Sequence, residues 1–133
     1  IVIKTPIIET IHGIETDGKN KFYLRLNMSR HPVLVSFLRQ IDSINRNDEI
    51  TKIISGNKKY INCFYYNNNT WKIKIPCKYG RFNVNVIDNK GNLIPTVSIK
   101  PTDKLQCDVE LTNIWNFNNS YGCIWNIKKI IVI

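Results

Sequence analysis

The chain has 133 residues, of which 43% are hydrophobic, and it carries 19 lysines and arginines against 10 aspartates and glutamates. This hydrophobic content excludes a disordered chain, and we expect a single domain over residues 1–133. The formal charge of +9 attracts polyanions, of which nucleic acid is the commonest and an anionic membrane surface the second. The alternative is a basic surface that merely reflects AT-rich codons.

The four cysteines are spread along the chain and do not form a metal-binding pattern. They form no Cys-x-x-Cys motif, and neither His12 nor His31 has the spacing of a zinc finger. We therefore expect reduced thiols in a cytosolic or nuclear setting, with no metal and no other cofactor. No signal peptide is recognisable, and no apolar run is long enough to span a bilayer, so we expect neither secretion nor a membrane partner.

The first half of the chain predicts one hairpin and one helix. Alternating apolar residues predict strands over 7–15 and 21–27 with a turn between them. Helical spacing predicts a helix over 31–45, with Ser29 as its N-cap and Pro32 in its first turn. Asp42 is predicted to face solvent, and residues 48–55 to be short helical or irregular. The predicted apolar face of the helix consists of Val33, Leu34, Phe37, Leu38, Ile41 and Ile44.

The second half of the chain is predicted to form strands separated by turns. In the clearest of them, 71–76, Trp71 and two isoleucines alternate with Lys72 and Lys74. Many short strands and one main helix predict an all-β fold, an elaborated OB-fold-like antiparallel barrel, with a β-sandwich as the alternative. The predicted strands cover 60–66, 71–76, 81–88 and 93–99, followed by a long hairpin over 105–133.

The sequence shows no recognisable catalytic constellation. The acidic residues are scattered, without the paired carboxylates of a two-metal site, and the glycines stand singly in turns rather than in a phosphate-binding loop. No nucleophile with a base partner can be identified from the sequence. We therefore do not expect an enzyme. A nuclease whose acidic ligands are dispersed along the chain is the remaining enzymatic alternative.

Cationic and aromatic side chains occur together in several predicted strands. Lysine and arginine bind phosphates, and flat side chains stack on bases at about 1–3 kcal/mol each. The three tryptophans share a phase with apolar residues and are predicted to be core, whereas Tyr121, in a turn, is predicted to be exposed. The predicted phosphate-binding residues are Arg25, Lys72, Lys74, Arg81 and Lys128, and the predicted stacking residues are Tyr66, Tyr79 and Tyr121. The alternatives are a solvated face for Lys72 and Lys74, and protection of a sheet edge for Lys128.

The final hairpin has an apolar strand with a tryptophan, a turn that ends in tyrosine and glycine, and a second tryptophan two residues before another apolar position. These residues are Val109, Leu111, Ile114-Trp115, Tyr121-Gly122, Ile124-Trp125 and Ile127. The hairpin resembles that of single-stranded-DNA-binding OB-fold proteins of large DNA viruses and some phages, and the resemblance covers about a fifth of the chain. It implies a non-catalytic protein that coats single strands in viral replication or recombination. It also implies an oligomer, replication proteins as partners, and a location in the host nucleus or at a cytoplasmic viral replication site.

These observations together predict sequence-tolerant binding of single-stranded DNA, and the residues alone do not distinguish DNA from RNA. The alternative is a structural or interaction module of a viral replication complex or virion. In that case the final hairpin would be an interface between proteins and the positive charge would be incidental.

Overall fold

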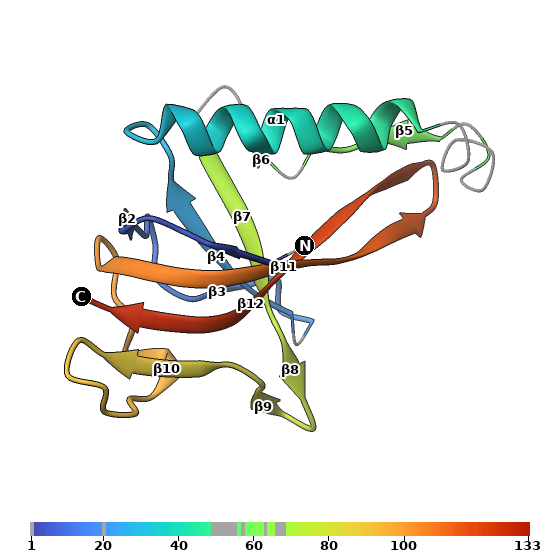
Figure 1. Ribbon diagram of the computed structural model, residues 1–133. Coiled ribbons are helices and arrows are strands. Elements are labelled where there is room, and N and C mark those ends of the chain that lie inside the picture. Colours follow the sequence, from blue (N-terminus) through green and yellow to red (C-terminus); the bar gives the residue numbers. More distant parts are fainter. Residues whose placement is uncertain (1, 20, 49–55, 57, 63, 66–68) are drawn as a thin grey trace.

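The computed structural model describes residues 2–19, 21–48, 56, 58–62, 64, 65 and 69–133. Figure 1 shows helix α1 lying across the strands, with the final hairpin extending beneath its C-terminal half. The elements of these residues are β1 (Val2–Lys4), β2 (Ile8–Glu9), β3 (Glu15–Thr16), β4 (Phe22–Asn27), α1 (Pro32–Asn47), β5 (Lys59–Tyr60), β6 (Phe64–Tyr65), β7 (Thr70–Ile75), β8 (Cys77–Lys78), β9 (Arg81–Phe82), β10 (Asn85–Asp88), the 3₁₀ helix η1 (Thr96–Ser98), β11 (Lys104–Phe117) and β12 (Ser120–Val132).

Most of these strands belong to one mixed sheet that does not close. Its main path is β1-β11-β12-β7-β4-β3, with β2 beside β11, β5 and β10 beside β12, and β6 beside β7. Most pairs are antiparallel, but β5, β7 and β10 run parallel to β12. A bridge between Thr10 and Leu26 links the β2 side of the sheet to the β4 side. The short strands β8 and β9 form a separate ribbon directly after β7.

Strand alternation builds the core along β7 as the sequence predicts. Trp71, Ile73 and Ile75 are each 0% exposed, whereas Lys72 and Lys74 lie on the opposite face and are partly exposed. The Trp71 ring packs edge-on against Trp125, with 5.5 Å between the ring centroids and 84° between the ring planes. Both tryptophans are therefore core residues, as predicted, and their large apolar surfaces contribute strongly to the stability of the fold.

Two β-bulges change the alternation of the long β11–β12 hairpin. The pairing passes from Leu111–Trp125 to Asn113–Ile124 and skips Thr112. The residues after Thr112 therefore point the opposite way from their sequence phase. This makes the prediction that Trp115 is a core residue wrong, because its side chain is only partly buried and stands across the hairpin from Gly122. The second bulge, at Lys128 in β12, has the same effect on the last residues of the chain.

Helix α1 forms close to its predicted position, although its ends differ in detail. Pro32 occupies the first turn, but the N-cap is His31 rather than Ser29, and no side chain caps the helix. The buried face is narrower than predicted, because Val33 is 83% and Ile44 65% exposed. No helix in the described part of the chain is both long and apolar enough to cross a membrane.

The C-terminal half of α1 is joined to β5 and β12 by a buried polar contact. Asp42 is 0% exposed, so the prediction that it faces solvent is wrong. The Tyr60 hydroxyl donates a hydrogen bond to Asp42 Oδ1 at 2.6 Å and lies 3.5 Å from Cys123 Sγ. Burial, followed by the hydrogen bond to Asp42, raises the pKa of Tyr60 far above its ordinary value of 10.0. The pairing of β12 with β5 also lays Tyr121 edge-on against Tyr60, at 5.2 Å between ring centroids.

Several predicted strands are shorter than expected or are replaced. The predicted strand 7–15 becomes β2 and β3 with a bend between them, and 60–66 becomes β5 and β6. The predicted strand 93–99 is wrong: it contains an isolated bridge at Leu93 and then the 3₁₀ turn η1. Residues 49–55, which carry most of the predicted short helix, lie outside the described residues.

Candidate functional site

A groove of about 450 Å³ lies between the outer face of β4 and β7 and the β11–β12 hairpin. It combines cationic, aromatic and aliphatic side chains from distant parts of the chain. Strand alternation explains the β4 and β7 contribution, because the residues between the buried ones point outward together. The groove is lined by Lys21, Tyr23, Ile61, Asn62, Lys72, Lys74, Trp115, Cys123, Ile124 and Trp125.

Cross-strand register brings the cations of the groove against Tyr23. Tyr23 pairs directly with Lys74, and Arg25 pairs with Lys72. The Lys72 Nζ atom lies 4.0 Å from the centroid of the Tyr23 ring, which is a cation–π distance. Partial burial, followed by the charge of Arg25, lowers the pKa of Lys72 from its ordinary value. The groove therefore holds the ammonium group of Lys72 against an aromatic face. A second ammonium group, that of Lys74, lies on the same strand.

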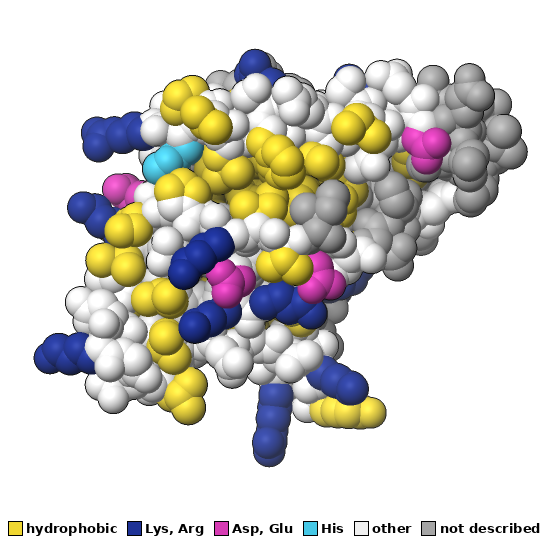
Figure 2. All heavy atoms as spheres, in the orientation of Figure 1, with side chains coloured by type: hydrophobic (Ala, Val, Ile, Leu, Met, Phe, Trp, Pro, Cys, Tyr) yellow, Lys and Arg dark blue, Asp and Glu magenta, His cyan; other side chains and the backbone are white. Residues whose placement is uncertain are grey.

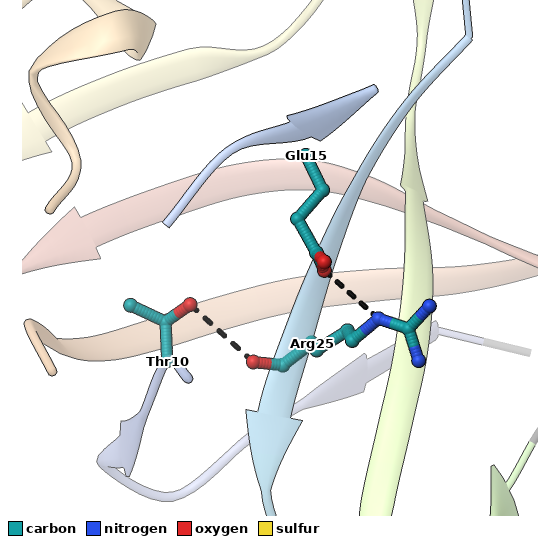
Figure 3. A network of polar contacts seen from close by, with 3 residues as sticks. All are labelled: Thr10, Glu15 and Arg25. Carbon is teal, nitrogen blue, oxygen red and sulfur yellow. Dashed lines mark hydrogen bonds and ion pairs between the residues drawn. The ribbon is translucent and has the colours of Figure 1, made fainter. Parts of the chain in front are cut away.

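Arg25 lies beside the groove and is held by a neighbouring carboxylate. Its Nε donates to Glu15 Oε2 at 2.9 Å, and its backbone carbonyl accepts a hydrogen bond from the Thr10 hydroxyl at 3.3 Å (Figure 3). Arg25 does not line the groove. Glu15 partly compensates the charge of Arg25. The structure therefore supports phosphate binding by Arg25 less than by the two lysines of β7, Lys72 and Lys74.

Trp115 forms one wall of the groove because a glycine stands opposite it. A Cβ atom on Gly122 would lie 2.7 Å from Trp115 Nε1 and 2.8 Å from the Ile61 carbonyl oxygen. These distances are far inside van der Waals contact, so only glycine lets the indole lie this close to the β12 backbone. The indole is consequently held against β12 as a partly exposed flat surface, next to Ile61 and Ile124 in the groove.

The β8–β9 ribbon places another aromatic group beyond the end of β7. Tyr79 is 92% exposed at the tip of the ribbon, and Lys78 Nζ lies 5.5 Å from its ring centroid. Arg81 is exposed and pairs with Lys78 across the ribbon. The ribbon is attached to the sheet by Phe82, which packs edge-on against Phe22 of β4 at 4.8 Å between centroids. Phe22 shares the inward face of β4 with Leu24 and Leu26, so the ribbon is attached on the face of β4 opposite Tyr23.

The structure brings two of the eight predicted site residues, Lys72 and Lys74, into the groove and places Arg25 beside it. Tyr79 and Arg81 lie on the ribbon, outside the groove. The prediction that Tyr121 is exposed is wrong, because its side chain is 2% exposed and cannot stack on a base without moving. Tyr66 lies outside the described residues.

Lys128 differs from the other predicted phosphate-binding residues in its surroundings. It is exposed in the β12 bulge, where its Nζ lies 3.6 Å from a carboxylate oxygen of Glu110. It does not line the groove. The ion pair offsets its positive charge, so Lys128 adds little to a site for an anion.

The sequence-based prediction omitted Lys21, Tyr23, Asn62 and Trp115 from the site. Tyr23 and Trp115 carried a usable signal, since Tyr23 alternates with buried leucines and Trp115 stands opposite a glycine in the hairpin. Lys21 and Asn62 lie just outside strands, where period-two patterns give no direction. Only the pairing of β4 with β7 and of β12 with β7 and β5 brings these residues together.

A second hollow, of about 530 Å³, lies between α1 and β1 and is mainly apolar. Figure 2 shows hydrophobic side chains gathered on this face, below the helix. Arg30, His31 and the aromatic residue Phe37 are among the residues that line it. Its chemistry suits contact with apolar groups better than with a phosphate backbone. Among the described residues, no group of three or more His, Cys, Asp or Glu side chains could hold a metal ion.

Comparison with known proteins identifies a similar fold. No family model and no curated protein sequence matches the chain. Among solved structures, a C-terminal truncation of the single-stranded DNA-binding protein from bacteriophage Enc34 superposes with a TM-score of 0.65. The match covers 98% of this chain and 84% of that chain at 8% sequence identity. It confirms the predicted mostly-β, OB-like fold with one helix, although the sheet is mixed rather than wholly antiparallel.

Proposed function

We propose that the protein binds single-stranded DNA in a sequence-tolerant way, in viral DNA replication or recombination. The observation that carries the proposal is the groove, where Lys21, Lys72 and Lys74 lie with Tyr23 and Trp115 on one side of the sheet. The similarity in fold to a phage protein that binds single-stranded DNA supports it. The net charge of +9 adds a long-range attraction for a polyanion.

The chemistry of the groove suits an unpaired strand better than a duplex. Ammonium groups contact phosphates, and base stacking on an aromatic surface requires that the flat face of the base be accessible. In a duplex both faces of each base are covered by neighbouring base pairs. Trp115 and Tyr23 can therefore be used by single strands, while Lys72 and Lys74 bind the backbone of either form.

The β8–β9 ribbon offers a second exposed aromatic group, beyond the end of β7. Tyr79 is available for a further base, and Lys78 and Arg81 flank it with two positive charges. The ribbon is a separate contact point, because Phe22 and Phe82 attach it on the face of β4 opposite the groove.

A competition experiment tests the proposal. The displacement of a labelled single-stranded oligonucleotide is followed by fluorescence anisotropy. Unlabelled single strands should displace it at far lower concentration than duplex of the same sequence. Unlabelled RNA in the same series decides between DNA and RNA. Affinity should fall steeply between 50 and about 200 mM salt, because binding releases counterions from the phosphates. Equal displacement by duplex and single strand, or no binding at micromolar protein in low salt, would contradict the proposal.

Replacing Trp115 by alanine is expected to weaken single-strand binding by roughly tenfold or more, since one stacked base contributes about 1–3 kcal/mol. Trp115→Phe should keep most of the affinity, because the smaller ring still offers a flat face. Anisotropy titrations of the two variants measure the difference, and the slope of affinity against salt should stay unchanged in both, because no phosphate contact is lost. An alanine variant that binds like the wild type would remove Trp115 from the site.

The apolar hollow between α1 and β1 favours a second candidate function, that of an interaction module. It would act through contact with apolar groups, and its residues lie outside the groove. Light scattering that shows a large stable assembly, together with an absence of nucleic-acid affinity, would favour this function over the first.

A further inference from the structure

We infer that Asn62 makes the groove prefer bases with a keto group, thymine and uracil, over cytosine with its amino group. This inference rests on the proposed function, because it concerns which bases bind best in the same groove. Asn62 lies just after β5 and lines the groove together with the three lysines and Trp115. It is the one side-chain amide among the described lining residues.

The orientation of the Asn62 amide is set by Arg46 at the end of α1. Arg46 Nη2 donates a hydrogen bond to Asn62 Oδ1 at 2.5 Å. Arg46 can only donate, so it selects the oxygen of the amide and turns the NH₂ group the other way. Within the described residues, the Asn62 Nδ2 atom has no hydrogen-bond partner. The amide therefore keeps two N–H donors for a ligand, while its acceptor is occupied.

Arg46 is itself held in place, which gives the orientation a structural basis. Its guanidinium carbon lies 5.6 Å from the centroid of the Tyr60 ring, within cation–π range. The Tyr60 ring is fixed by its hydroxyl bond to Asp42 and by its edge-on contact with Tyr121. The buried contact between helix and hairpin thus reaches the groove through Arg46 and sets which atoms of Asn62 face a ligand.

The other polar side chains of the groove reinforce this bias toward donors. Three ammonium groups can only donate, and none of the described lining residues is a carboxylate. Thymine and uracil present the O4 acceptor where cytosine presents an N4 amino donor. A donor that faces another donor loses its hydrogen bond to water without replacing it, which disfavours cytosine at that position. Lysines that bind phosphates do not change this difference, because the backbone is the same for every base.

Homopolymers of deoxythymidine, deoxyuridine and deoxycytidine test the inference in one titration series. All three bases are single rings, so differences in stacking are smaller than between purines and pyrimidines. We expect the thymidine and uridine polymers to bind about five- to tenfold more tightly than the cytidine polymer, as one neutral hydrogen bond implies. Thymidine binding much more tightly than both uridine and cytidine would overturn the inference, because the methyl group would then be the feature recognised.

Variants of Asn62 separate the amide from the rest of the groove. Asn62→Ala should bring the ratio of thymidine to cytidine affinity close to one. Asn62→Asp should shift the ratio toward cytidine, since a carboxylate oxygen accepts from N4, although its charge lowers both affinities. Asn89→Ala, at an exposed asparagine in the turn after β10, should leave the ratio of the wild type unchanged.

The outcomes distinguish failure of this inference from failure of the proposed function. A wild-type protein that binds all three polymers equally, with a steep salt dependence, keeps the proposed function and overturns the role of Asn62. An Asn62→Ala variant that retains the full thymidine preference overturns it as well. If no polymer binds at low salt, the proposed function itself fails, and the inference fails with it.

Discussion

Replacing Lys72 and Lys74 together by glutamate is expected to abolish most single-strand binding. The exchange turns two attractions for phosphates into two repulsions, which at partly exposed sites costs about 3 kcal/mol or more, or roughly 100-fold in affinity. It also removes the contact of Lys72 with the Tyr23 ring. Because both side chains lie on the outer face of β7, the fold should be retained, and circular dichroism checks this.

The matched control for this variant makes the same change in net charge at two lysines outside the groove. Lys90 and Lys100 are exposed and do not line the groove, so their joint replacement by glutamate should weaken binding far less. Neutral replacement of Lys72 and Lys74 by glutamine should make the slope of log affinity against log salt shallower by about 1.4, since each lost phosphate contact to a single strand accounts for about 0.7. Equal losses in the two glutamate pairs would show that net charge, and not the groove, governs binding.

Replacing Tyr60 by phenylalanine is expected to lower the free energy of unfolding by about 1–3 kcal/mol, because the buried Asp42 side chain loses this hydrogen bond. The variant removes the hydroxyl that contacts the Asp42 side chain but keeps the ring and its packing against Tyr121. Urea unfolding at neutral pH measures the loss. Tyr79→Phe, at an exposed tyrosine on the ribbon, is the control and should leave the stability unchanged. A loss below about 0.5 kcal/mol for Tyr60→Phe would show that the hydroxyl bond adds no net stability.

The same substitution should also change how stability depends on pH. The pKa of Tyr60 is raised in the folded state, so the stabilisation it provides is complete below the unfolded value of 10.0 and is lost as the pH rises above it. The wild type should therefore lose more stability than Tyr60→Phe between pH 9 and 11, and the gap between the two proteins should narrow. Parallel curves over this interval would contradict the raised pKa.

Much of the sheet could be predicted because alternation depends on local sequence alone. In β7 the alternate residues Trp71, Ile73 and Ile75 are buried, and their apolar side chains at every second position predict this. The prediction fails where a bulge adds one residue, because Thr112 reverses the direction of Trp115 without leaving a mark in the apolar pattern. It also fails for Tyr121, whose burial depends on the pairing of β12 with β5, far away in the sequence.

The candidate site was predicted in part for the same reason. Lys72 and Lys74 are found by alternation, and Tyr79 and Arg81 were predicted as an aromatic residue and a cation on the same face of a strand. Asn62 could not be predicted, because its role depends on Arg46 from the helix and on β5 lying beside β12. Sequence patterns thus identify residues that face outward, while tertiary pairing decides which of them share a groove.

The bulge at Lys128 gives the C-terminal end of the chain one position that can be lost without changing the strand pairing. Ile127 and Ile130 are both buried although three positions separate them, and Lys128 and Lys129 lie between them. Val109 pairs with Ile127 and Asp108 with Lys129, so Lys128 is the extra residue and has no partner on β11. Deleting Lys128 would leave the pairing of every later residue unchanged and would restore simple alternation. In a library of this segment, deletion of Lys128 should therefore survive, whereas deletion of Ile127 should be lost, because Lys128 would then take its place opposite Val109 in the core.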